Sequence, residues 1–104
     1  MAIINHKGES VTLDLSRCYP ASPNQRAIEA TCADGEPWAT FTVCLPKANL
    51  EADQTILDTN DYPEIVDILG LAGLIVETGV FIPSGFCRYP VVTFTDKAKD
   101  LYSS

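Results

Sequence analysis

The dipeptide Asp34-Gly35 is the feature that most constrains this fold. This pair favours a type I′ β-turn, and it lies between two alternating stretches, 25–33 and 37–45. A two-residue turn places Glu29 opposite Thr40 and Thr31 opposite Trp38. A shift of one residue in this register would mix polar with apolar side chains on each face. The sequence therefore predicts a β-hairpin whose core-facing residues are Ile28, Ala30, Cys32, Ala39, Phe41, Val43 and Leu45.

Further strands are predicted before and after this hairpin. Residues 10–16 alternate between polar and apolar side chains, which is typical of a half-buried strand. Residues 20–24 are rich in turn-forming residues and are predicted to be a loop, whereas 56–57 are predicted to be a short edge strand. Residues 74–82 are expected to be extended. The last strand, 86–95, contains a proline that cannot donate to a ladder, so it is predicted to lie at an edge or to bulge there.

One helix is predicted between residues 61 and 73. Asp61 is a good N-cap, Glu64 occupies the capping-box position and Gly73 is a typical stop. Gly70 inside this helix costs about 1 kcal/mol relative to alanine, so we expect it to mark close packing on a strand. The 104 residues are thus predicted to form a single α+β domain, 1–104, with a mostly antiparallel β-sheet and one α-helix packed on a face.

The positions of the charges are more informative than their total. A net charge of −7, with 14 acids against 7 bases, argues against direct binding of nucleic acid or of a membrane surface. Residues 48–87 contain no lysine or arginine, so the whole negative excess belongs to this middle stretch. Six of its acids lie close together in sequence and are predicted to bind a partner: Glu51, Asp53, Asp58, Asp61, Glu64 and Asp67.

This acidic segment supports two interpretations. A one-sided field speeds association with a basic partner, so the segment could dock on a protein groove that normally holds nucleic acid. Alternatively it is a solvated loop in which Asp61 and Glu64 only stabilise the positive end of the helix. Trp38, on the more polar face of the hairpin, is a further candidate contact, because tryptophan is enriched at binding hot spots. The other interpretation of Trp38 is that the helix or the end of the chain covers it.

The sequence contains no clear motif for catalysis, a metal or a cofactor. His6, the only histidine, lies near an N-terminus that we expect to fray. Residues 58–63 begin like a calcium loop, but Tyr62 stands at a ligand position and Pro63 where glycine is needed. The cysteines lack the paired spacing of zinc sites and are expected to be free thiols that behave as small apolar residues: Cys18, Cys32, Cys44 and Cys87. We therefore expect a cytoplasmic protein that is not an enzyme, with no metal, no cofactor and no membrane segment.

Three segments carry a resemblance to a known family: Glu36-Pro37-Trp38-Ala39-Thr40-Phe41-Thr42-Val43-Cys44-Leu45-Pro46, Ile82-Pro83-Ser84-Gly85-Phe86 and Pro90-Val91-Val92-Thr93-Phe94. The pattern resembles an uncharacterised family of small acidic proteins carried by phages and conjugative elements of gut bacteria. The likeness extends over about residues 11–95 and brings no catalytic residues with it. It implies an accessory protein of a mobile element, and such proteins often bind and disable host defence machinery.

These observations lead to three hypotheses from different functional classes. The first is a non-enzymatic inhibitor of a host nuclease or CRISPR-type effector, whose acidic segment competes for a basic groove. The second is a structural subunit that forms a homodimer or larger assembly through an edge strand at residues 91–94. The third is a thiol-dependent or small-molecule enzyme. The sequence favours the first of these hypotheses.

Overall fold

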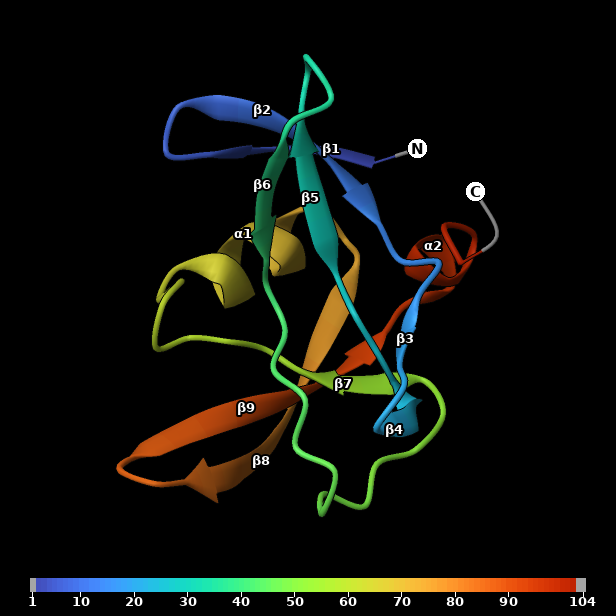
Figure 1. Cartoon of the computed structure of the whole chain (residues 1–104), viewed down its shortest axis with the longest axis vertical. Coiled ribbons are helices and arrows are strands. Elements are labelled where there is room, and N and C mark those ends of the chain that lie inside the picture. Colours follow the sequence, from blue (N-terminus) through green and yellow to red (C-terminus); the bar gives the residue numbers. More distant parts are fainter. Residues whose placement is uncertain (1, 103–104) are drawn as a thin grey trace.

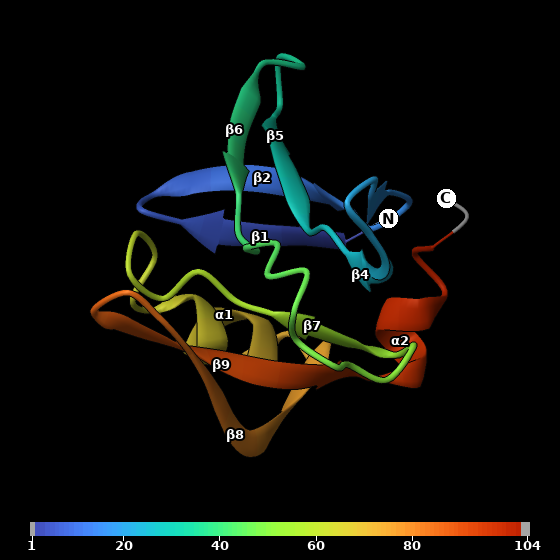
Figure 2. The ribbon, with the colours of Figure 1, turned by 60° about the horizontal axis from the view of Figure 1, so that its bottom comes forward.

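In the computed structural model, which describes residues 2–102, two antiparallel β-sheets lie in separate layers (Figures 1 and 2). The four-stranded sheet has the order β1-β2-β5-β6, formed by Ala2–His6, Glu9–Asp14, Glu29–Cys32 and Pro37–Thr40. The three-stranded sheet has the order β7-β9-β8, formed by Gln54–Ile56, Cys87–Phe94 and Ile75–Ser84. A small hairpin joins β3 (Cys18–Tyr19) to β4 (Ser22–Arg26). With helices α1 (Ile65–Leu71) and α2 (Asp96–Lys99), the predicted α+β fold is confirmed.

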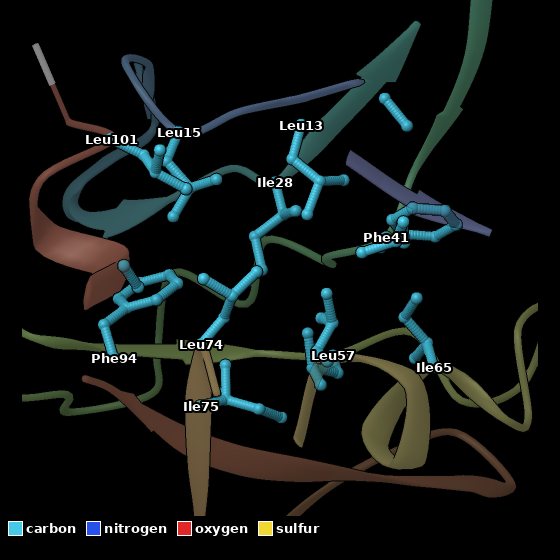
Figure 3. Close-up of a cluster of buried hydrophobic side chains, with 14 of the residues drawn as sticks. Leu13, Leu15, Ile28, Phe41, Leu57, Ile65, Leu74, Ile75, Phe94 and Leu101 are labelled. Atoms are coloured by element: carbon cyan, nitrogen blue, oxygen red, sulfur yellow. The ribbon is translucent and has the colours of Figure 1, made fainter. Parts of the chain in front are cut away.

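The hydrophobic core lies between the two sheets. Leu13 and Ile28 approach it from the four-stranded side, and Ile75 and Phe94 approach it from the three-stranded side (Figure 3). The helix α1 contacts both β1 and β8, so it closes one side of the space between the layers (Figure 2). Its buried residues, Ile65 and Leu69, belong to the same hydrophobic cluster as the sheet residues. Both sheets and α1 therefore share one core.

The predicted hairpin around Asp34-Gly35 is present, but it is shorter than expected. Glu29 lies opposite Thr40 as predicted, whereas a β-bulge after Ala30 places Thr31 opposite Pro37 and not opposite Trp38. The strand β6 ends at Thr40, and the chain then crosses to the other layer. There the Val43 N–H donates to the Ile56 carbonyl at 3.1 Å. The prediction of a strand that continues to Leu45 was wrong because residues 41–43 connect the two sheets.

The strand β9 lies at the centre of its sheet and not at an edge. Gln54–Ile56 and Ile75–Glu77 pair with it on its two sides. The alternative prediction, a bulge in the last strand at Pro90, is also wrong, because the extra residues lie in the neighbouring strand: four steps along β8, from Glu77 to Phe81, face only two steps along β9, from Val92 to Pro90. This arrangement overturns the proposed homo-oligomer contact at residues 91–94, because no free backbone edge exists there.

Two other segments also differ from the sequence-based expectation. Residues 20–24, predicted to be a loop, contribute to the β3–β4 hairpin. The N-terminal residues, which we expected to fray, form β1, and Ala2–His6 pair with β2 along their whole length. The predicted strand at 10–16 corresponds to β2, which ends earlier, at Asp14. Val11 and Leu13 in this strand and Leu15 just after it are buried.

The helix α1 is shorter than predicted and begins differently. Asp61 is not its N-cap, because the Asp61 N–H donates to Asp58 Oδ1 at 3.2 Å within the turn before the helix. The cap position belongs to Glu64, whose side chain makes no capping hydrogen bond. The helix ends as predicted at Gly73, which has a φ of 76° and allows the Leu74 N–H to reach the Leu69 carbonyl at 3.1 Å.

Candidate protein-binding groove

A groove of about 430 Å³ lies between the helix α1 and the strand β8. Its helical wall is formed by Val66, Asp67, Gly70 and Leu71, and its strand wall by Ile75 and Glu77. We call this feature the acidic groove, because one exposed carboxylate stands on each wall, Asp67 on α1 and Glu77 on β8. A cationic side chain in the groove would therefore meet a carboxylate on either side.

The acidic groove continues into a larger group of exposed acids. Glu64, the N-cap residue of α1, is exposed three residues before Asp67, and Asp61 is exposed in the turn that leads into the helix. We call these four residues the acidic flank: Asp61, Glu64, Asp67 and Glu77. Within residues 2–102, no ion pair involves any of them. Among the described residues, therefore, no basic side chain neutralises the flank.

Large apolar side chains are exposed beside these carboxylates. Leu71, on the helical wall, is 92% exposed, and Val76, next to Glu77 on β8, is 59% exposed. Further along β8, Val80 and Phe81 are exposed as well. Exposed apolar groups next to unpaired charges are typical of surfaces that bind another protein. The surface thus offers apolar contact area in addition to charge.

The other predicted acidic residues do not join the acidic flank. Glu51 and Asp53 precede β7 whereas Asp61 follows it, so the strand separates the two groups. Asp53 is also paired with Lys99, whose Nζ lies 3.6 Å from its Oδ2. Asp58 is buried, at 8% exposure, and its burial raises the pKa of its carboxyl, an effect that the hydrogen bond from the Asp61 N–H partly offsets. Of the six predicted acids, only Asp61, Glu64 and Asp67 therefore form one exposed group.

Trp38 has an internal role. Its Nε1–H donates to Nδ1 of His6 at 2.9 Å, and its half-buried ring packs against the core. His6 is only 1% exposed and also makes edge-to-face contacts with Phe41 and Tyr62. The indole N–H is therefore already bonded, and Trp38 is not part of the acidic groove. The residue that contacts Trp38 here is His6 of β1, and not the helix or the end of the chain that the second interpretation named.

Sequence reasoning missed Glu77 and the exposed apolar residues of the groove. Glu77 stands ten positions from Asp67, and only the pairing of β8 with β9 and the packing of α1 bring the two walls together. The available signal was Leu71, which lies outside the apolar residues that recur at helical spacing in this segment: Tyr62, Ile65, Val66, Leu69 and Ala72. An apolar residue outside such a stripe indicates an exposed position on the helix.

The remaining chemistry of the described residues is limited. No group of three or more His, Cys, Asp or Glu side chains in residues 2–102 is arranged to hold a metal ion. The four cysteines are free, as predicted, but Cys18 is exposed and the other three are only half-buried. None of the helices in the described part of the chain has the length and apolar character needed to cross a membrane.

The comparisons with known proteins give one result at the level of the family. Searches of the curated proteins and of the solved structures found no match. A family model described as "Domain of unknown function (DUF4313)" matches residues 12–103, which include the three-stranded sheet, α1 and the acidic groove but not β1 or the start of β2. This match is consistent with the uncharacterised family that the sequence resembles. The chain belongs to the family described as "Domain of unknown function (DUF4313)".

Proposed function

We propose that this chain is a non-enzymatic protein-binding module that docks its acidic flank on a basic partner. The observation that carries this proposal is the acidic flank, whose four exposed carboxylates have no ion pair within residues 2–102 and two of which, Asp67 and Glu77, line the groove. Such a field attracts a cationic surface before contact, and the exposed Leu71 and Val76 add apolar area after contact. Together they provide both steering and short-range affinity.

The arrangement of the exposed carboxylates suggests the class of partner. A row of carboxylates can compete with phosphates for a basic groove, so the proposed target is a host protein that normally holds nucleic acid, such as a nuclease or a CRISPR-type effector. The resemblance to proteins of phages and conjugative elements supports this proposal, in which the interaction takes place in the cytoplasm of a bacterial host. In this proposal the protein is an inhibitor that mimics nucleic acid and does not bind it.

A pull-down from host lysate with matched charge variants tests the proposal. The triple variant Asp61→Lys, Glu64→Lys and Asp67→Lys reverses three acids of the flank. The control variant Glu9→Lys, Glu36→Lys and Asp100→Lys reverses three exposed acids that lie outside the flank. Both variants carry a net charge of −1 in place of −7, so only the position of the charge differs.

We expect the wild type and the control to retain a basic partner at low salt and to release it at high salt, because surface charges are screened. The flank variant should lose the partner at low salt. Added double-stranded DNA should displace the partner from the wild type if both use the same groove. Equal retention by the flank variant and the control would contradict docking through the acidic flank, and failure of DNA to compete would contradict mimicry of nucleic acid.

A further inference from the structure

The acidic groove follows the free edge of a β-sheet. The strand β8 is the last strand of the order β7-β9-β8, so one of its sides has no neighbouring strand. The Thr95 N–H donates to the Leu74 carbonyl at 3.0 Å, which shows that the backbone of Leu74 faces β9. Because backbone groups alternate along an antiparallel strand, those of Ile75 and Glu77 point the other way. These two residues are the strand wall of the groove.

The opposite wall is open at Gly70. This glycine lies inside α1 with an ordinary helical backbone, where it costs about 1 kcal/mol relative to alanine. A Cβ atom built on it would meet nothing within 4 Å, so the expectation that close packing requires glycine here was wrong. What the missing side chain does provide is width in the groove, because Gly70 lines it.

From this geometry we infer that the acidic groove binds an extended cationic segment of a partner protein, which pairs as an additional strand with the free edge of β8. The inference rests on the proposed function and specifies its partner. Main-chain hydrogen bonds to Ile75 and Glu77 hold the segment, as in other cases of strand addition. Its basic side chains meet Asp67 and Glu77 in the groove, and its apolar side chains, which alternate with them, contact Val76 on the other face of the sheet.

A second copy of the chain fits this edge less well. Antiparallel pairing of β8 with its own copy would bring two acidic grooves together, and each chain carries a net charge of −7. Like charges at an interface disfavour a complex, whereas lysine or arginine in the added strand would neutralise Asp67 and Glu77. Charge complementarity thus selects a basic segment over self-association.

A capped synthetic peptide of alternating lysine and valine is the probe. Its affinity for the full chain is measured by calorimetry, and the hydrogen exchange of the Ile75 and Glu77 amides is followed in parallel. A second peptide has the same side chains and charges, but every backbone nitrogen is methylated, so that it cannot donate hydrogen bonds to β8. Gly70→Leu fills the groove from the helical wall without a change of charge. Ala52→Leu adds the same side chain on the exposed loop before β7 and is the matched control.

We expect the unmethylated peptide to bind the wild type and the Ala52→Leu control equally and to slow exchange at Ile75 and Glu77. Methylation of the peptide and Gly70→Leu should each weaken binding about tenfold or more, the effect expected for the loss of two backbone hydrogen bonds. Strand addition would be overturned if the unmethylated peptide did not bind. It would also be overturned if the methylated peptide bound the wild type equally well, or if the Gly70→Leu variant bound the unmethylated peptide as well as the wild type does.

The proposed function and strand addition are contradicted by different results. If Asp67→Lys with Glu77→Lys abolishes binding while methylation has no effect, docking by charge stands and strand addition falls. If the flank variant still captures the lysate partner, the proposed function falls whatever the peptides do.

Discussion

At the scale of single residues, the pair formed by His6 and Trp38 explains two misjudged positions. His6 was expected near a frayed terminus, although Ile4 and His6 alternate with exposed residues as in any half-buried strand. The signal for β1 was the short Lys7-Gly8 turn, in which both residues have positive φ angles of 53° and 82°. Trp38 was placed on the polar face because a β-bulge cannot be deduced from alternation alone.

Trp38→Phe should destabilise the protein by about 1–3 kcal/mol, because it leaves the buried Nδ1 of His6 without a donor. Urea unfolding measures this change. The double variant His6→Phe with Trp38→Phe removes both polar partners, so its loss should be smaller than the sum of the single losses. Additive losses would show that the hydrogen bond contributes little.

Asp58→Asn should change how stability depends on pH. Burial raises the pKa of Asp58 above its ordinary 3.8, so the folded protein holds this proton more tightly than the unfolded chain. Protonated Asp58 therefore contributes to the stability of the fold in acid, and this contribution is lost as the pH rises above the pKa of this group in the folded protein. The amide oxygen of the new asparagine would keep an acceptor for the Asp61 N–H, so we expect the variant to match or exceed wild-type stability at about pH 7 and to lose this advantage at about pH 3.

Asp14→Asn is the control of opposite sign for this pH experiment. Hydrogen bonds from the Ser16 side chain and backbone lower the pKa of Asp14, so its contribution is present at neutral pH and disappears in acid. Urea unfolding of both variants at the two pH values should give opposite trends. The same trend in both variants would contradict the assignment for Asp58.

At the scale of elements, local sequence patterns predicted which segments form strands better than they predicted which strands lie next to each other. Alternation identified β2, and Asp34-Gly35 identified the β5–β6 turn, because both signals lie within a few residues. The central position of β9 depends on β7, which is more than thirty residues earlier in the chain. Pro90 suggested an edge, yet it lies just beyond the β7 ladder and opposite Phe81, where the register of β8 shifts.

Two glycines of the α1 region should respond in opposite ways to alanine. Gly70→Ala should stabilise the protein by up to about 1 kcal/mol, because its backbone is helical and space for a Cβ is free. Gly73→Ala should destabilise it by about 1–2 kcal/mol, because a φ of 76° is unfavourable for residues with a Cβ. Thermal unfolding compares the two variants. Destabilisation by Gly70→Ala would reveal a packing role for this glycine that the free space around it argues against.

At the scale of the whole molecule, the candidate site could be predicted only in part. Charge counting found Asp61, Glu64 and Asp67, because they are close in sequence. It could not find Glu77 or exclude Glu51 and Asp53, because their positions depend on how β7, β8 and α1 pack. Burial removed Asp58 from the surface for the same reason. A surface made from separate segments is a property of the fold and not of any single stretch.

The core that both sheets share leads to a prediction about the cooperativity of unfolding. Leu57 is fully buried in the cluster that contains residues of both sheets, so Leu57→Ala should cost about 2–5 kcal/mol. Because both layers depend on this cluster, they should unfold together in urea, in the wild type and in the variant.

Fluorescence of Trp38, the only tryptophan, reports on the four-stranded sheet, and hydrogen exchange of the Val92 amide reports on the three-stranded sheet. A transition of Trp38 that precedes loss of protection at Val92 would mean that the sheets are separate folding units. Coincident transitions would support the prediction of a single domain, and the acidic groove would then be lost only by global unfolding.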